Sequence, residues 1–541
     1  MSYTSLLFVI FALVVTVVYF AFPIKKYQWT VLLVASYVFY LCASVKSFFF
    51  IFFTTITTYV VTRMLEKIQL DAKVVLKDNK ETWNRESKKA FKIKVESKKR
   101  KLVSIVLLAN FGILAFLKYY NFFGESINNV LKTIGLSAEL PGLKLILPLG
   151  ISFYTFQSMG YIVDVYRGTV SAEKNFAKLA LFVSFFPQII QGPIGIYNHL
   201  ANQLYESHKF DFTRMKYGME LILWGYFKKM VIADRAVTAI NAYIADYQVF
   251  NGGTTLFIVI LYALQLYADF SAGIDISRGL AQIWGIDMAH NFRRPYFARS
   301  INEYWRRWHI TLGDWMKNYV FYPLAMSKMF LNISKKMKNT KFGQTATGAH
   351  IAKVLPASIA SFVVFFLVGV WHGANWKYVG FGIWNGGIIM LSTLMKPCFE
   401  YINQKLRISA DAMWFRLFQM FRTFIVVAIG YVFDIAPHFK GSIQMLYSSI
   451  ANINIGTTWN QIRDMLLLSK MDYLVVFLGA LVILIVSLLQ ERQSQVSLRI
   501  RLDKTCFPLR WVLVFGCVVC IMIFGIYGPG YDVAEFVYMQ F

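Results

Sequence analysis

The sequence predicts an all-α polytopic integral membrane protein with about 11 to 12 transmembrane helices, and three observations support this. Hydrophobic residues make up 57% of the 541 residues, aromatic residues make up 17%, and the mean hydropathy is +0.49. Apolar segments of about 17 to 22 residues, long enough to cross a ~30 Å hydrocarbon layer as helices, recur along the whole chain. The 56 lysines and arginines exceed the 29 acidic residues, giving a formal charge of +27. Such an excess is typical of cytoplasmic loops that face anionic lipid, and we expect no nucleic-acid partner.

The candidate spans share an apolar composition and a length close to that of a membrane-crossing helix. They are residues 5–22, 29–45, 48–61, 102–123, 145–166, 215–240, 256–276, 355–371, 379–394, 415–433, 473–489 and 511–527. The first lacks a basic leading region and a small-residue cleavage site, so we expect a span and not a removable signal peptide. The five cysteines lie mostly in or beside apolar segments and show no paired zinc pattern. We therefore expect no disulfide framework and no bound metal.

Basic stretches predict the orientation of these spans. The charged stretch 63–101 is rich in lysine, and residues 328–353 contain lysines without an acidic residue, so both are expected on the cytoplasmic side. Counting spans from these stretches places the N- and C-termini outside. The span 355–371 then runs outward and, at ~1.5 Å per residue, carries His372 about 25 Å from the cytoplasmic edge. His372 is thus expected in the outer half of the membrane.

Two further segments differ from simple spans. Residues 181–197 are apolar but contain Pro187 and Pro193, which predicts a re-entrant segment enclosed by protein or beside a wet cavity. Residues 292–324 mix arginines with tryptophans, which predicts a cytoplasmic-side helix that dips into the fold. We find no internal repeat and expect no separate soluble domain.

The motif VGVWHGANW carries His372 at the end of an apolar run. A histidine in such surroundings needs a partner or a water path, and a neutral imidazole there is able to serve as a general base for a hydroxyl or thiol. Gly369 and Gly373 predict close approach of a neighbouring helix. The alternative is a core histidine that is hydrogen-bonded to a neighbouring helix, and the residues alone leave both interpretations open.

A second motif, RRPYFARSINEYWRRWHITLGDW, places His309 directly after a tryptophan. Its arginines suit charge-assisted hydrogen bonds to a phosphate-bearing donor, and its aromatic side chains suit an apolar slot. The alternative is that the arginines reach lipid headgroups while His309 packs in an interfacial helix. The candidate donor-binding or channel residues of the two motifs are Arg299, Trp305, Arg306, Arg307, Trp308, Trp371 and Asn375.

Signatures of several common enzyme classes are absent from the sequence. There is no HExxH pair, no GxSxG elbow and no phosphate-binding Gly-Lys-Ser/Thr loop. The usual support for a metalloprotease, serine hydrolase or ATPase is therefore missing, and we expect no bound cofactor.

Five stretches in this order resemble the membrane-bound O-acyltransferase superfamily, in its bacterial branch of alginate O-acetyltransferases and D-alanyl transfer proteins. They are SFYTFQSMGYIVDVYRG (152–168), FFPQIIQGPI (185–194), YADFSAGIDISRGLA (267–281), NFRRPYFARSINEYWRRWHITL (291–312) and GVWHGANW (369–376). The resemblance implies a helical ring with a central funnel in one membrane domain over residues 1–541. Its expected parts are N-terminal helices over 1–143 with a basic cytoplasmic loop at 63–101, a catalytic core over 144–395, and C-terminal helices with an aromatic tail over 396–541.

The resemblance also implies an activity. The protein is expected to move an acyl group, with acetyl favoured over D-alanyl, from a cytoplasmic thioester donor across the membrane for O-acylation of a cell-surface or exported polysaccharide. The donor would be acetyl-CoA or an acyl carrier protein as substrate, and an extracellular partner similar to SGNH hydrolases would complete the transfer. The implied location is the bacterial cytoplasmic membrane, in contact with lipid and crossed many times.

The same resemblance assigns residue roles. His372 matches the catalytic histidine of the family, and His309 matches its second characteristic histidine, nearer the cytoplasm. Tyr538, in the tail FVYMQF, matches a tyrosine proposed to carry the acyl group before the partner takes it. An aromatic anchor at the membrane interface is the alternative for this tail.

Two other functions stay open at this stage. D-alanyl transfer to teichoic acid from a carrier protein fits the same branch. A polytopic transporter or flippase whose histidines relay protons belongs to another class. The absence of inverted-repeat symmetry and the scarcity of acidic residues within the spans weigh against a transporter.

Overall fold

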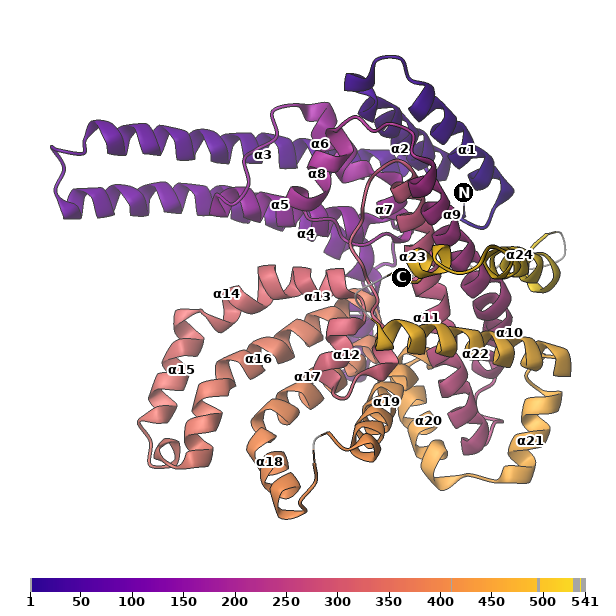
Figure 1. Cartoon of the computed structure of the whole chain (residues 1–541). Coiled ribbons are helices and arrows are strands. Elements are labelled where there is room, and N and C mark those ends of the chain that lie inside the picture. The colour runs from indigo at the N-terminus through magenta and orange to yellow at the C-terminus, as the bar shows by residue number, and fades with distance from the viewer. Residues whose placement is uncertain (1, 410, 494–496, 529–535, 537–541) are drawn as a thin grey trace. The chain divides into compact units, whose positions relative to one another are not determined.

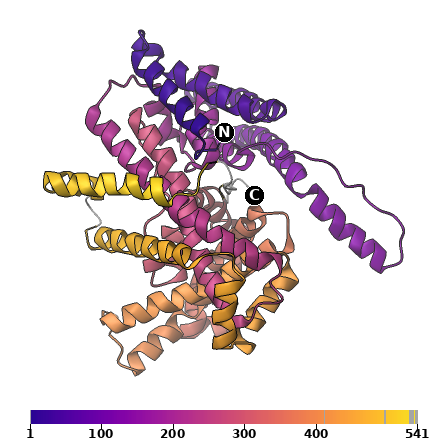
Figure 2. The ribbon, with the colours of Figure 1, turned by 90° about the vertical axis from the view of Figure 1, so that its right-hand side faces the viewer.

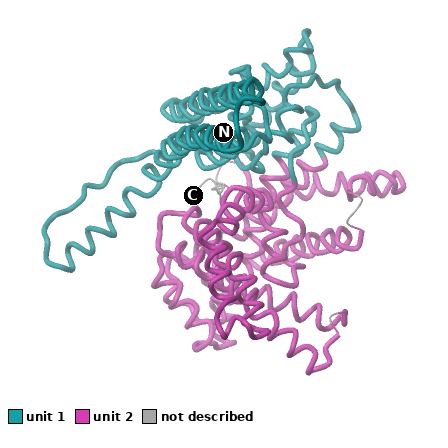
Figure 3. Tube along the Cα trace, turned by 90° about the vertical axis from the view of Figure 1, so that its left-hand side faces the viewer, with its two compact units in different colours: residues 1–219, 277–289 teal, residues 220–276, 290–541 magenta. Residues whose placement is uncertain are grey.

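The computed structural model describes residues 2–409, 411–493, 497–528 and 536, and every regular element among them is a helix (Figure 1). The predicted fold class, an all-α polytopic membrane protein, is confirmed. The described chain divides into two compact units, drawn in different colours in Figure 3. Unit 1 comprises residues 1–219 and 277–289, and unit 2 comprises residues 220–276 and 290–541.

Unit 1 contains the N-terminal helices. They are α1 (Leu6–Ala21), the short 3-10 turn η1 (Lys25–Tyr27), α2 (Trp29–Ala43), α3 (Val45–Asp78), α4 (Arg85–Thr133), α5 (Ile151–Arg167), α6 (Phe176–Ser184), α7 (Phe186–Gln191) and α8 (Tyr197–Tyr205). The boundary between the units falls within α9 (Phe212–Tyr226) and again within α11 (Gly252–Ile283).

Unit 2 contains the remaining helices, including two π-helical turns, η2 and η4. They are η2 (Phe227–Ala233), α10 (Asp234–Ala245), η3 (Pro295–Phe297), α12 (Ile301–Arg307), α13 (Ile310–Met316), η4 (Lys317–Phe321), α14 (Tyr322–Ala325), α15 (Lys328–Lys338), η5 (Phe342–Gln344), α16 (Ala346–His372), α17 (Trp376–Leu394), α18 (Lys396–Lys405), α19 (Met413–Ile435), α20 (Phe439–Ala451), α21 (Ile455–Asp464), α22 (Lys470–Arg492), α23 (Leu498–Asp503) and α24 (Phe507–Phe524).

Seven of the described helices are long and apolar enough to cross a membrane, and they coincide with seven of the expected spans. They are α3, α4, α11, α16, α19, α22 and α24. The pair α17 and α18, bent by 58°, makes an eighth candidate when it is counted as one span. The chain is therefore a multi-pass membrane protein.

The remaining four expected spans are helical but shorter or interrupted. Helices α1, α2 and α5 have 16, 15 and 17 residues. At ~1.5 Å per residue these lengths fall somewhat short of a ~30 Å hydrocarbon layer. The stretch 215–240 is divided between α9, η2 and α10, because a π-helical turn interrupts the regular hydrogen-bond ladder.

The basic stretch 63–101 in unit 1 consists of the end of one helix, a short turn at residues 79–84 and the start of the next helix. Helix α3 continues to Asp78, α4 begins at Arg85, and the two lie side by side as a long hairpin (Figure 1). Asn84 caps α4, since its side chain accepts a hydrogen bond from the amide of Ser87 at 2.8 Å. Lysine and glutamate are good helix formers, so many of these charges lie along exposed helix faces.

The expected re-entrant stretch of unit 1 is broken and buried, as its prolines predicted. Helix α6 ends at Ser184, α7 begins after Phe185 with Pro187 in its first turn, and the chain stays buried from Leu179 to Ile194. Proline is tolerated in the first turn because the amide of that position has no helical partner.

The arginine-rich stretch 292–324 of unit 2 corrects one prediction. It forms η3, α12, α13, η4 and α14 instead of one continuous helix. Arg294 and His309 adopt left-handed backbone conformations with φ of 49° and 47°, which a continuing α-helix does not permit. The breaks turn the chain back, so that the amide of Ile310 bonds to the carbonyl of Asn291 at 3.0 Å.

Close packing of α16 on α17 positions the histidine motif. A Cβ atom added at Gly369 would lie 2.4 Å from the carbonyl oxygen of Tyr378 and 2.7 Å from Gly382. One added at Gly373 would lie 2.2 Å from the Tyr378 ring. The predicted close helix approach at these glycines is confirmed, and larger residues would push α16 and its terminal His372 away.

Burial differs among the long helices of unit 2. The apolar stretch of α11 is 78% buried, whereas none of the corresponding stretch of α24 is buried. Helices α22 and α24, gold and yellow in Figure 2, both contact η2. The exposed apolar surface of α24 requires lipid around it, whereas most of the apolar stretch of α11 is covered by protein.

Candidate active site

His309 is fixed in the interior of unit 2 by the turn between α12 and α13. Its side chain is only 2% exposed and its ring packs edge-to-face on Phe270 with 4.9 Å between centroids. The Nδ1 atom lies 3.2 Å from Oδ1 of Asn291, which is itself buried. A non-glycine residue with positive φ is strained, so this position is held by its surroundings.

The hydrogen bonds of Asn291 define the tautomer of His309. Its Oδ1 accepts from the backbone amide and from the hydroxyl of Thr311, both at 3.0 Å. A backbone amide only donates, so this oxygen is an acceptor and Nδ1 of His309 must donate to it. Burial, with the neighbouring imidazole of His372 as a second cause, lowers the pKa of His309 below its ordinary value. The ring is therefore neutral at pH 7, with its lone pair on Nε2.

His372 ends α16 among aromatic side chains. Its ring lies 5.2 Å from the Phe381 ring and 6.3 Å from the Tyr378 ring, measured between centroids. The indole of Trp371 lies 5.3 Å from His372 and 6.0 Å from His309, so both imidazoles contact one ring. The structure thus brings together two histidines that are separated by more than sixty residues in the sequence.

A cavity of about 20 Å³ opens beside His372. It is lined by Leu266, Tyr304, Trp305, Trp308, His372, Phe381, Asn385, Val427, Tyr431 and Asp434. This volume holds about one water molecule. The indole Nε1 of Trp305 is buried and donates to no acceptor among the described residues. A buried donor of this kind suits a polar atom of a bound substrate.

Tyr304 and Tyr431 also line the cavity, and the sequence did not indicate a role for either. The hydroxyl of Tyr431 lies 2.6 Å from that of Tyr304 and 3.1 Å from that of Tyr296. Asp434 accepts a hydrogen bond from Tyr262 at 2.6 Å. An aspartate at the end of an apolar span was the available signal, but α19 was judged by its hydrophobicity alone. Asn291 was missed as well, because only the fold shows that it contacts His309.

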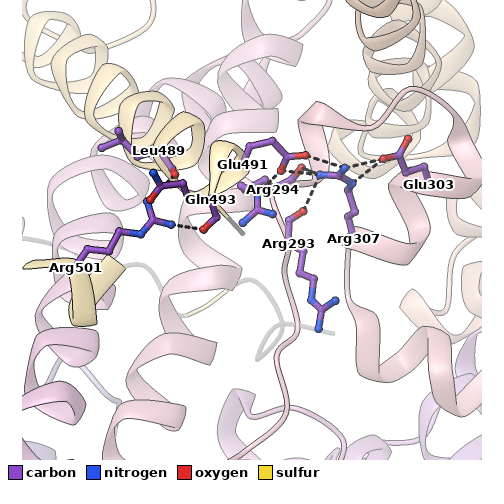
Figure 4. A network of polar contacts seen from close by, with 8 residues as sticks. All are labelled: Arg293, Arg294, Glu303, Arg307, Leu489, Glu491, Gln493 and Arg501. Atoms are coloured by element: carbon purple, nitrogen blue, oxygen red, sulfur yellow. Dashed lines mark hydrogen bonds and ion pairs between the residues drawn. The ribbon is translucent and has the colours of Figure 1, made fainter. Parts of the chain in front are cut away.

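The arginines of the second motif divide into paired and exposed members, and Figure 4 shows the ion pairs of Arg294 and Arg307. Arg307 donates to Glu303 at 2.7 Å and to Glu491 of α22 at 3.1 Å. Arg294 forms an ion pair with Glu491 as well. These two charges are compensated by two carboxylates, and the pairs tie α12 to the end of α22.

The other predicted site residues lie in different surroundings. Arg299 and Arg306 are exposed. Asn375 caps α17, because its Oδ1 accepts from the amide of Lys377 at 3.0 Å, which is a structural role. Trp308 is buried and stacks on Tyr304 with 5.7 Å between centroids. Tyr538 lies outside the described residues.

Comparison with known proteins bears on these motifs. The model of MBOAT, the membrane-bound O-acyltransferase family, matches residues 170–340, a stretch that includes His309 and the arginine-rich motif. The resemblance to this family is confirmed. His372 lies beyond the matched stretch and joins it through the packing around Trp371.

Three relatives represent three acceptors. The chain is 31% identical over 326 residues to the probable alginate O-acetylase AlgI of Pseudomonas syringae pv. tomato, covering 60% of this chain and 56% of the relative. It is 29% identical to the peptidoglycan O-acetyltransferase of Helicobacter pylori, covering 64% of each chain. It is 28% identical to the teichoic acid D-alanyltransferase of Bacillus subtilis, covering 55% of this chain and 71% of the relative. The chain thus matches less than two thirds of the length of the alginate and peptidoglycan relatives.

Proposed function

We propose that the chain is a membrane-bound O-acyltransferase that moves an acyl group from a thioester donor to a hydroxyl group. The acyl group that we propose is acetyl, and the final acceptor is a polysaccharide. One observation carries the proposal. His372 lines one cavity together with Trp305 and Trp308 of the arginine-rich motif. The indole of Trp371 contacts both His309 and His372. The similarity to O-acetylating relatives, which is greater than that to D-alanyltransferases, favours acetyl.

His372 acts as the general base in this proposal. The hydroxyl oxygen of the acceptor attacks the thioester carbonyl carbon while His372 accepts the hydroxyl proton. The new C–O bond forms, the C–S bond breaks, and the leaving thiolate takes the proton back from His372. The aromatic walls leave little space for water beside the imidazole, which limits competing hydrolysis.

The donor approaches from the side of the exposed arginines. Arg299 and Arg306 are accessible to the phosphates of an acetyl-CoA or of an acyl carrier protein, while Arg307 is held between two carboxylates. Trp305 offers its indole N–H to a carbonyl oxygen in the cavity. The donor is a substrate, and the reaction requires no resident cofactor.

The topology that accompanies this mechanism follows the basic stretches. The donor side is cytoplasmic, both termini lie outside, and the chain spans the cytoplasmic membrane of a bacterium. An extracellular partner similar to SGNH hydrolases receives the acyl group, with Tyr538 as an intermediate carrier.

The test uses purified protein in proteoliposomes with acetyl-CoA as donor, the extracellular partner, and a soluble polysaccharide as acceptor. We expect donor-dependent acetylation of the acceptor, and loss of ~100-fold or more of the rate in His372→Ala. Undiminished transfer by a folded His372→Ala variant would overturn the catalytic role. Uptake driven by an ion gradient without acyl donor would instead support a transporter.

Mass spectrometry of the peptide that contains Tyr538 separates the acyl groups. We expect an added mass of one acetyl group during turnover, whereas the mass of an alanyl group would favour D-alanyl transfer. A tyrosine that stays unmodified during turnover would contradict its role as a carrier.

A further inference from the structure

Three contacts of the C-terminal segment converge on the π-helical turn η2 and the start of α10. The amide of Ile526 donates to the carbonyl of Met230 at 2.9 Å. Arg235 donates to the carbonyl of Phe524 at 2.7 Å. The ring of Phe536 lies over Lys229, with 4.4 Å between Nζ and the ring centroid. Phe524, Ile526 and Phe536 therefore each contact η2 or the start of α10.

The π-helical turn explains one of these contacts. In a regular α-helix the amide of Asp234 would bond to the carbonyl of Met230. In η2 this amide bonds to the carbonyl of Lys229, one residue earlier. The carbonyl of Met230 accepts from Ile526 instead. The irregular turn thus provides a backbone acceptor for the C-terminal segment.

Two carboxylates hold the ammonium group of Lys229 in place. Its Nζ lies 2.7 Å from Oδ1 of Asp269 and 2.8 Å from Oδ1 of Asp234, and all three side chains are at most 1% exposed. Phe536 is fully buried. A cation away from water attracts an aromatic face more strongly than a hydrated one, so the ring gains both burial and a cation–π contact.

The neighbouring Lys228 provides an internal comparison. It pairs with Asp275 at 2.7 Å and bonds to Ser271 at 2.6 Å, and the ring nearest to its Nζ in the described contacts is that of Trp224 at 5.8 Å. The two adjacent lysines are both buried, but Lys229 is the one that Phe536 covers.

We propose that Lys229 is a positioning residue that anchors the C-terminal segment of the chain through Phe536. The contact holds Phe536 against the unit that contains His309 and His372. Tyr538 follows Phe536 by two positions in the sequence. The contact at Phe536 limits how far Tyr538 is able to move from the unit that contains His309 and His372. The value of this limit for acyl transfer rests on the proposed function.

Hydrogen exchange of the full-length protein in lipid nanodiscs tests the anchor without reference to activity. Phe536→Leu keeps an apolar side chain but removes the aromatic face, and we expect about 5-fold or faster exchange in peptides from 525–541. Phe515→Leu, at an exposed phenylalanine of α24, is the matched control and should leave this exchange unchanged. Unaltered exchange in Phe536→Leu would overturn the proposal, even if the wild-type protein transfers acyl groups.

Progressive fluorination of the ring at position 536 tests the cation–π contact with almost no change of shape. We expect exchange in 525–541 to quicken stepwise with fluorine number, and equal exchange in all derivatives would contradict the contact with Lys229. Lys229→Arg, which retains the cation, should preserve protection, whereas Lys229→Met should lose it and Lys228→Met should not. In the transfer assay, Phe536→Leu should lower kcat for the acceptor with the donor KM unchanged. Faster exchange in a protein without any acyl transfer would retain the anchor and refute the proposed function.

Discussion

Unit 2 buries two kinds of ionisable group and surrounds them differently. His309 and His372 lie among aromatic rings and share the indole of Trp371. Lys228 and Lys229 lie among carboxylates, with every ammonium–carboxylate distance below 3 Å. Replacing a neutral imidazole leaves no unpaired charge and should cost the protein little stability. Removing a carboxylate partner of a buried ammonium leaves an unpaired charge and destabilises the protein. The first region therefore suits proton transfer, and the second suits the fixation of structure.

The largest effect is expected at the buried histidines. His372→Ala should reduce acyl transfer by ~10²- to 10⁴-fold, since a general base contributes about this much, while the protein remains folded. The measurement is the transfer rate in proteoliposomes, together with gel filtration and the thermal midpoint. His199→Ala, at an exposed histidine, is the control and should retain full activity.

The lysine cluster should respond in the opposite way. Asp269→Ala leaves Lys229 with one of its two carboxylates and should destabilise the protein by about 3–5 kcal/mol. The midpoint of unfolding in a denaturing-detergent titration reports this change. Asp464→Ala removes an exposed carboxylate that pairs with Arg463 and should shift the midpoint little. Equal shifts in the two variants would show that burial does not distinguish these pairs.

Overpacking at Gly369 tests how tightly the histidine is positioned. Gly369→Val would force α16 away from α17 and should cost about 1–3 kcal/mol of stability. Because His372 ends the same helix, transfer should decline more than the stability loss explains. Gly387→Val is the comparison, since a Cβ added there meets no atom within 4 Å. If both variants keep wild-type transfer, helix spacing is not what positions the imidazole.

Variants of the adjacent Arg306 and Arg307 should distinguish a role in donor binding from a role in stability. Arg306→Gln removes an exposed charge and should raise the donor KM by about 10-fold, the worth of one charge-assisted hydrogen bond, with unchanged stability. Arg307→Gln breaks contacts with Glu303 and Glu491 and should lower stability while leaving the donor KM nearly unchanged. The reverse pattern would assign donor binding to the paired arginine.

The smallest effect concerns the cap of α17. Asn375→Ala should cost about 1 kcal/mol, because the amide of Lys377 loses its acceptor. Asn375→Ser retains a capping oxygen and should restore most of the stability, as measured by the detergent-unfolding midpoint. A loss of transfer in both variants with unchanged midpoints would instead indicate contact with substrate.

Hydrophobic length and residue type were sufficient to predict much of the fold. All twelve expected spans contain helices, and the proline-containing stretch 181–197 is broken, as predicted. The charge of the stretch 63–101 predicted a side of the membrane and not a local conformation, and its lysine-rich ends continue α3 and begin α4 as exposed helices. The break at His309 was not predicted because a left-handed conformation is uncommon for any single residue other than glycine.

The candidate site was predictable only in part, and the limit is physical. Both histidines could be identified from their motifs, but contacts between distant segments depend on the fold. Asn291 sets the tautomer of His309 from another turn, and Tyr431 reaches the cavity from α19. Neither residue differs from an ordinary polar or aromatic residue in its own segment. The pairing of Lys229 with Asp269 is likewise a tertiary contact across helices.

The left-handed backbone at His309 has a consequence for how variants would be selected. Glycine adopts this conformation without strain, so random mutagenesis followed by a screen for thermal stability alone should enrich glycine or asparagine at position 309. A screen for acyl transfer should retain histidine at the same position. Divergence of the two populations at this one codon would be a direct record of a strained residue maintained for its chemistry.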